Sequence, residues 1–75
     1  MNDELKQAIA DELNVDPAEL TSDKKLPDIE DFDSVSVLML MMIIGKFVGK
    51  DITPDEMTEL RTFGDIEALV ASKQS

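Results

Sequence analysis

The chain has 75 residues, 43% of them hydrophobic, and a formal net charge of -10 at pH 7. A chain of this length builds a single core, so we expect one domain over residues 1–75 rather than two lobes with a cleft between them. Seventeen acidic against seven basic residues exclude a cationic surface for nucleic acid, and the lack of cysteine excludes disulfides and thiolate metal sites.

A first helix is predicted from about residue 3 to residue 13. Asn2 is a suitable N-cap, and the acidic residues at positions 3 and 4 would lie in the first turn, where negative charge stabilises the helix dipole. The helix should end near Asn14, because the Asp16-Pro17 pair disfavours its continuation. Apolar residues recur at helical spacing and define one buried stripe: Leu5, Ala8, Ile9 and Leu13.

A long connection follows over residues 15–33. A loop of this length in a small domain is often functional, and we expect a short helical turn in it after Pro17. Four apolar residues are spaced along it as anchors to the core: Leu20, Leu26, Ile29 and Phe32.

Three further helices are predicted. The second covers residues 34–48, with Asp33 or Ser34 as its N-cap and Gly49 at its end, because glycine readily adopts the left-handed conformation found there. A capping box over residues 53–56 begins a short third helix, and a similar cap over residues 62–65 begins the last one. No strand pattern competes, so the prediction is an all-α fold of four helices.

Ser34 stands where an acidic loop turns into the second helix. The chain has no histidine or cysteine to activate its hydroxyl, so Ser34 is better explained as a site that another protein modifies than as a nucleophile. A simple helix cap is the alternative. The run over residues 28–33 begins like a calcium loop, but Asp33 replaces the glycine that such a loop needs at its sixth position and Met39 replaces the glutamate at its twelfth, so we expect no metal site.

Taken together, several segments of the chain resemble the acyl carrier protein family, also called phosphopantetheine-binding carrier domains. Residues 14–20 resemble the family's end of helix one, and Asp33-Ser34-Val35 resembles its Asp-Ser-Leu attachment motif, with valine for leucine. Residues 52–55 and 62–66 resemble the starts of its third and fourth helices. The resemblance covers nearly the whole chain and implies a four-helix bundle of acyl-carrier type, with a long first loop and a short third helix.

This resemblance implies a carrier that is not itself an enzyme. It implies that Ser34 is esterified with 4′-phosphopantetheine, taken from coenzyme A by a magnesium-dependent phosphopantetheinyl transferase, and that Asp33 helps to recruit the transferase and its metal. The thiol of the arm would carry acyl groups as thioesters. The expected partners are therefore the transferase and the acyl-loading and acyl-processing enzymes.

The second predicted helix departs from the family pattern. In many acyl carriers this helix bears acidic residues that dock onto basic patches of enzymes, but here no carboxylate lies between residues 34 and 50. One stripe is able to pack inward: Val37, Leu40, Met41 and Ile44. The opposite side is also apolar: Leu38, Met39, Met42 and Ile43.

A helix that is apolar all round either is fully buried or exposes a contact surface. We therefore predict that enzymes dock through Val35, Leu38, Met39 and Met42. An acyl-chain cavity and a homodimer seam are the alternatives, and a monomer is expected otherwise. These departures, with bulky Phe32 beside the serine, favour a specialised fatty-acid, lipid or polyketide pathway.

A rival function is an acidic helical binding module, such as an inhibitor or a degenerate carrier-like protein, with no prosthetic group. As to location, residues 1–4 do not resemble a signal peptide, and the longest apolar run is far shorter than the ~20 residues that span a bilayer. Absence of cysteine fits a reducing compartment. We therefore expect a cytoplasmic protein without a membrane span.

Overall fold

The computed structural model describes residues 2–74. The elements follow in this order: α1 (Asp3–Leu13), the short 3-10 helices η1 (Pro17–Glu19) and η2 (Leu26–Asp28), α2 (Ser34–Val48), α3 (Pro54–Thr58) and α4 (Phe63–Gln74). The described residues form no strand, only an isolated bridge between Lys25 and Thr62. The prediction of an all-α protein with four helices and a short third helix is confirmed.

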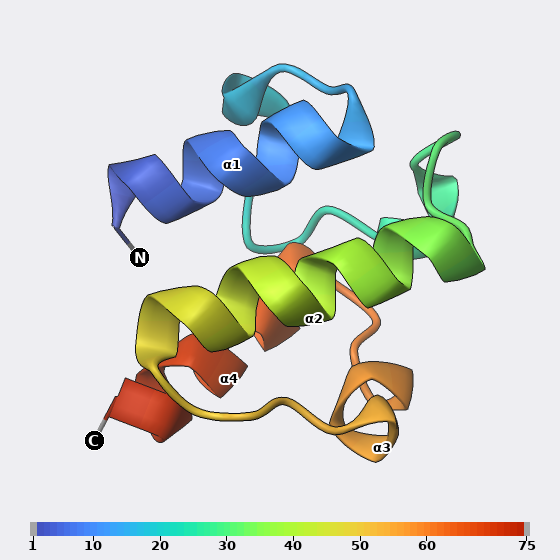
Figure 1. Ribbon diagram of the computed structural model, residues 1–75. Coiled ribbons are helices and arrows are strands. Elements are labelled where there is room, and N and C mark those ends of the chain that lie inside the picture. Colours follow the sequence, from blue (N-terminus) through green and yellow to red (C-terminus); the bar gives the residue numbers. More distant parts are fainter. Residues whose placement is uncertain (1, 75) are drawn as a thin grey trace.

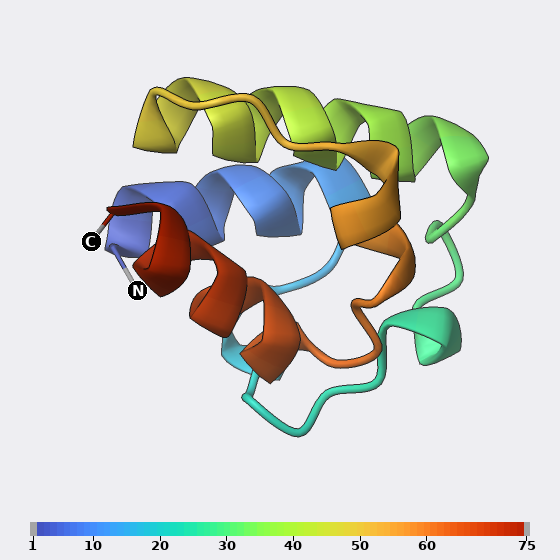
Figure 2. The same ribbon diagram turned by 90° about the horizontal axis from the view of Figure 1, so that it is seen from below.

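Helix α2 is the centre of the arrangement, because it contacts α1, α3 and α4. Helices α1 and α2 lie side by side and run in opposite directions (Figures 1 and 2). Helix α4 crosses behind α2 in Figure 1, and the short α3 lies to one side, after the segment that leaves the end of α2. The first turn of α2 projects at the edge of the molecule in both views.

Local capping explains where the helices begin and end. The Asn2 side chain accepts hydrogen bonds from the N–H groups at the start of α1, and Asn14 ends this helix in the left-handed conformation with φ 56°. Gly49, with φ 71°, ends α2 in the same way. Thr53 and Glu56 form the predicted capping box of α3. These capping residues confirm the predicted helix boundaries. The boundaries were predictable because capping depends on residues close together in the sequence.

The core lies between α1, α2 and α4. Its fully buried side chains come from all three helices and from the long loop: Ile9, Leu13, Leu20, Leu26, Leu40, Ile44, Phe63 and Ile66. Ala8, predicted in the buried stripe of α1, is only half-buried because it borders a groove between α1 and α2, whereas Ala10 is buried. No helix within residues 2–74 combines the length and apolar character that a membrane crossing requires.

The long loop over residues 15–33 is tied down rather than free. Its expected helical turn after Pro17 is present as η1, and three of its four predicted anchors are buried, while Phe32 packs half-buried against the core. Backbone hydrogen bonds connect it to the start of α4: Phe63 N–H donates to the Lys24 carbonyl at 2.9 Å, and Gly64 N–H donates to the Ser22 carbonyl at 2.9 Å. A Cβ on Gly64 would lie 2.7 Å from that carbonyl oxygen, so glycine is needed for this close approach.

Candidate functional site

Ser34 is the first residue of α2 and is exposed. Figure 1 shows this first turn at the outer end of the helix, directly after the loop that leads into it. Within residues 2–74, no hydrogen bond engages the Ser34 hydroxyl, although the side chains of Asp33, just before it, and Ser36, two residues after it, are hydrogen-bonded. An enzyme in solution can therefore approach this hydroxyl without first breaking a hydrogen bond within the described part of the chain.

Asp33, and not Ser34, is the N-cap of α2. Its Oδ1 accepts a hydrogen bond from the Ser36 N–H at 2.9 Å, and its carbonyl accepts the first helical hydrogen bond, from Val37 N–H, at 3.0 Å. The hydrogen bond from the Ser36 N–H is the main reason that the pKa of the Asp33 carboxyl lies below its ordinary value of 3.8. A negative charge thus stands beside the Ser34 hydroxyl at neutral pH.

Ser36 supports the site from the buried side, a role that the sequence analysis missed. Its side chain is buried, and its Oγ donates a hydrogen bond to the Asp31 carbonyl at 2.5 Å. This bond holds the end of the loop against the first turn of α2. Helical spacing contained the signal, because Ser36 lies four residues before the buried Leu40 and eight before the buried Ile44.

The opposite side of α2 is an exposed apolar surface. Its four large side chains have high exposed fractions: Val35 65%, Leu38 58%, Met39 38% and Met42 67%. We call these four residues the α2 apolar patch. The patch begins immediately after Ser34, and all four side chains predicted as partner-binding are therefore accessible. Helix α2 has no acidic residue in its first turn.

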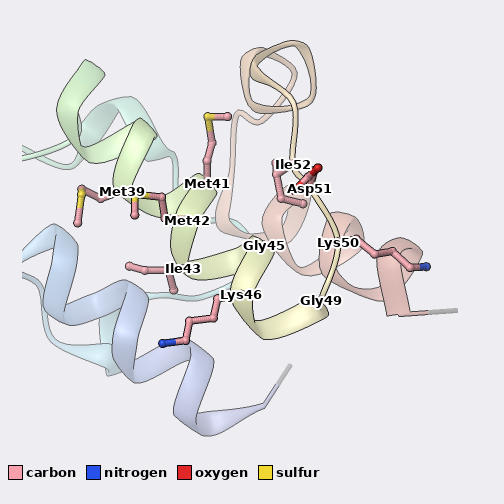
Figure 3. A pocket seen from close by; sticks show the side chains of 10 residues that line it. All are labelled: Met39, Met41, Met42, Ile43, Gly45, Lys46, Gly49, Lys50, Asp51 and Ile52. Atoms are coloured by element: carbon pink, nitrogen blue, oxygen red, sulfur yellow. The ribbon is translucent and has the colours of Figure 1, made fainter.

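Three residues of α2 differ from their predicted positions. Ile43 was expected on the exposed side, but it is half-buried against the core, because it lies on the α1 side of the helix with Phe47. Val37 and Met41, both expected to pack inward, are only half-buried. Figure 3 shows the Met41 side chain on the side of Ile52, while Ile43 and Lys46 extend on the side that faces α1.

Two shallow hollows border the C-terminal half of α2, and both are open to solvent. The larger, of about 870 Å³, is lined by Met39, Met41, Met42, Ile43, Gly45, Lys46, Gly49, Lys50, Asp51 and Ile52 (Figure 3). The smaller, of about 410 Å³, lies between α1 and α2 and is lined by Glu4, Leu5, Ala8, Ile43, Lys46 and Phe47. Neither hollow includes Ser34 or Asp33. Among residues 2–74, no group of three or more acidic side chains is placed to hold a metal ion.

Comparison with known proteins identifies the family to which the chain belongs. Residues 3–70 match the family model described as "Phosphopantetheine attachment site". The chain belongs to this family. Acyl carrier protein MbtL of Mycolicibacterium paratuberculosis is 34% identical over 70 residues, covering 93% of this chain and 79% of that protein. Acyl carrier proteins of Rickettsia typhi and Tropheryma whipplei are 33% and 31% identical, covering 92% of this chain and 80% and 85% of those proteins.

As an acyl carrier protein, the chain holds a covalent 4′-phosphopantetheine group and is a carrier rather than a catalyst. When attached, this group supplies a terminal thiol that holds acyl chains as thioesters. The residues around Ser34 fit such a group. The hydroxyl is exposed and forms no hydrogen bond with any of the described residues, and the positive end of the α2 dipole suits a phosphate diester.

Proposed function

We propose that Ser34 is the attachment residue and that the protein carries acyl intermediates in a specialised fatty-acid, lipid or polyketide pathway. The observation that carries the attachment proposal is the exposed hydroxyl at the first position of α2, engaged by no other group within residues 2–74. A site that a second enzyme must esterify needs this accessibility. Ser36, the next serine along the helix, is buried and hydrogen-bonded, so it does not compete.

Asp33 and Ser36 give Ser34 a defined position. The carboxylate of Asp33 caps the helix, and the Ser36 hydroxyl donates a hydrogen bond to the Asp31 carbonyl, so the chain is constrained one residue before and two residues after Ser34. When Ser34 is esterified, its Oγ attacks the phosphorus of coenzyme A that bears the pantetheine arm, the diphosphate bond at that phosphorus breaks, and adenosine 3′,5′-bisphosphate leaves. This chain offers no histidine as a base, so the hydroxyl proton passes to the transferase. The charged Asp33 beside it is suited to attract the magnesium ion that the transferase uses.

The pathway proposal depends on the surface of α2. An enzyme that works on the arm must approach Ser34, and the adjoining surface is the α2 apolar patch, without any carboxylate on the helix. We propose that Val35, Leu38, Met39 and Met42 contact the acyl-loading and acyl-processing enzymes. Enzymes that recognise an acidic helix would find no matching charge here, which supports a dedicated set of partners. We propose a single-domain, cytoplasmic monomer over residues 1–75.

The attachment is tested by intact-mass spectrometry after incubation with coenzyme A, magnesium and a broad-specificity phosphopantetheinyl transferase. We expect one added arm on the wild-type protein and none on Ser34→Ala. Ser22→Ala is the matched control, since Ser22 is also exposed and its loss should leave the addition unchanged. An arm on Ser34→Ala, or no arm on the wild type with several transferases, would overturn the proposal. The second result would favour an acidic binding module without a prosthetic group.

A further inference from the structure

The exposed side of α2 ends in a cation. Lys46 is the only charged residue of α2, and it is exposed. Its spacing, four residues after Met42, places it directly beyond the α2 apolar patch on the helix surface, and in Figure 3 its side chain extends on the same side of α2 as those of Met42 and Ile43. At about 1.5 Å per residue, Lys46 lies roughly 17 Å along the helix from Val35.

The other end of the same surface is negative. We call residues 28–33 the acidic loop, because four of these six residues carry exposed carboxylates: Asp28, Glu30, Asp31 and Asp33. The loop runs directly into Ser34 and the first turn of α2. The surface along α2 therefore changes from negative beside Ser34, through apolar in the middle, to positive at Lys46.

No salt bridge within residues 2–74 neutralises the charge of Lys46. Within residues 2–74, the one ion pair joins Lys73 Nζ to Glu56 Oε2 at 2.8 Å, on other elements. Glu4 of α1 lines the same hollow as Lys46, but the two side chains do not form an ion pair. In the last turn of α2, Lys46 also interacts favourably with the helix dipole, a role that does not require any particular neighbour.

We propose that α2 docks onto an acyl-processing enzyme whose surface has the complementary polarity. That enzyme presents cationic groups opposite the acidic loop, apolar side chains opposite the α2 apolar patch, and a carboxylate opposite Lys46. The proposal rests on the proposed function, because an enzyme that handles cargo on Ser34 must cover the surface that begins there. Opposite charges at the two ends fix the direction and register in which the surfaces meet. An enzyme that is basic along the whole contact is disfavoured by Lys46.

The size of the surface favours a short-lived complex with an enzyme over a stable complex with a second copy of this chain. Two antiparallel α2 helices would also bring Lys46 of each copy toward the acidic loop of the other. From their exposed fractions, however, the four patch residues offer on the order of 400 Å² of accessible area. This is the usual size of the largest exposed apolar patch on a monomeric protein. A stable interface buries about 800 Å² per partner, whereas short-lived encounters need less.

The test uses two helical peptides as probes of the partner surface. Both peptides have the same apolar face of leucine and methionine, and both carry arginines at one end. At the other end, the first peptide carries glutamates and the second carries arginines. Each is titrated into isotope-labelled protein at low ionic strength, and affinity and binding position are read from the NMR shifts. The variants are Lys46→Glu and, as a matched control, Lys25→Glu. Each variant changes the net charge from -10 to -12 by the same replacement.

Lys25 suits this control because its side chain is exposed and its segment lies on the opposite side of the molecule from α2 in Figure 2. We expect shifts on the exposed side of α2. The affinity ratio of the glutamate peptide to the arginine peptide should fall about threefold or more in Lys46→Glu and stay unchanged in Lys25→Glu. The ratio cancels the attraction that any cationic peptide has for an acidic protein.

Three results would overturn the inference: an equal change of the ratio in both variants, no change in either, or no shifts on the exposed side of α2. Self-association through α2 in sedimentation experiments would overturn it as well, since a second copy would then be the occupant. The titrations are run on the protein before and after treatment with the transferase. Failure of Ser34 to accept an arm is therefore seen by mass, separately from the peptide ratio.

Discussion

Helices α1 and α2 each bury one stripe of aliphatic side chains, but their solvent-facing sides differ completely. The exposed side of α1 carries the carboxylates of Asp3, Glu4 and Asp11, whereas that of α2 carries apolar side chains and one lysine. Burial in the core explains why the inner stripes are apolar, but it does not determine which residue types lie on the solvent-facing sides. The apolar outer side of α2 is therefore the part of the helix that packing does not explain.

The two helices also differ in how they begin. A neutral Asn2 caps α1, while a charged Asp33 caps α2, next to Ser34, the proposed attachment residue. A side chain of either type satisfies the first N–H groups of a helix. The carboxylate adds a negative charge at the site and makes the start of α2 sensitive to acid.

The largest effects on stability should come from the inner stripes, and they should be equal for the two helices. Ile9 of α1 and Leu40 of α2 are both fully buried. We expect Ile9→Ala and Leu40→Ala each to lower the free energy of unfolding by about 2–5 kcal/mol, because each leaves a cavity. Urea unfolding followed by circular dichroism measures this.

If these variants do not fold, Ile9→Val and Ile44→Val, at about 0.5–1.5 kcal/mol each, make the same comparison. The exposed Met42 is the control, and Met42→Ala should change the free energy by less than about 0.5 kcal/mol. A much smaller cost in α2 than in α1 would contradict the equivalence of the two inner stripes.

A smaller effect on stability is expected where the inner side of α2 holds the end of the long loop, through Ser36 and Asp31. Ser36→Ala removes the hydrogen bond from Oγ to the Asp31 carbonyl. We expect a loss of about 0.5–1.5 kcal/mol in the free energy of unfolding and faster amide hydrogen exchange at the end of the loop. Ser22→Ala, which removes an exposed hydrogen bond to Glu67, is the comparison. Equal effects of the two changes would show that the buried bond has no special role.

Acid should distinguish the two caps. Because its pKa is lowered by the Ser36 N–H, ionised Asp33 contributes stability at a pH above its unfolded value, which is near 3.8, and that contribution is lost as the pH falls through the lower folded value. Asp33→Asn keeps a capping side chain but should reduce the loss of stability below about pH 4. Asn2→Asp should have the reverse effect at α1. Urea unfolding across this pH range provides the test, and an unchanged acid dependence in Asp33→Asn would contradict the assignment.

The smallest effect on stability should come from the outer side of α2. Leu38→Gln and Met42→Gln replace exposed side chains, so we expect changes within about 0.5 kcal/mol in the free energy of unfolding. The same variants should be less active with any enzyme that docks on this surface. A loss of stability above 1 kcal/mol would mean, by the magnitudes typical of buried positions, that the patch is packed rather than free.

Much of the fold was predictable from residues that act on their immediate neighbours. Asn2, Gly49 and Thr53 were identified as caps, and the helices begin and end at these positions in the structure. The choice between Asp33 and Ser34 as the cap of α2 stayed open, because both residue types cap helices equally well. In the structure, the Asp33 carboxylate accepts a hydrogen bond from the Ser36 N–H, and no group within residues 2–74 forms a hydrogen bond with the Ser34 hydroxyl.

Sequence pattern alone determined the helices, their order and the serine at the start of α2, because capping and helical spacing depend on residues only a few positions apart. Only the tertiary structure decided which apolar residues of α2 remain exposed, since that depends on where α1 lies. Thus Ile43 is half-buried in the groove with α1, while Met42, one residue earlier, faces solvent. The hydrogen bonds that join the long loop to the start of α4 connect residues about forty positions apart in the sequence, and no local pattern predicts such pairs.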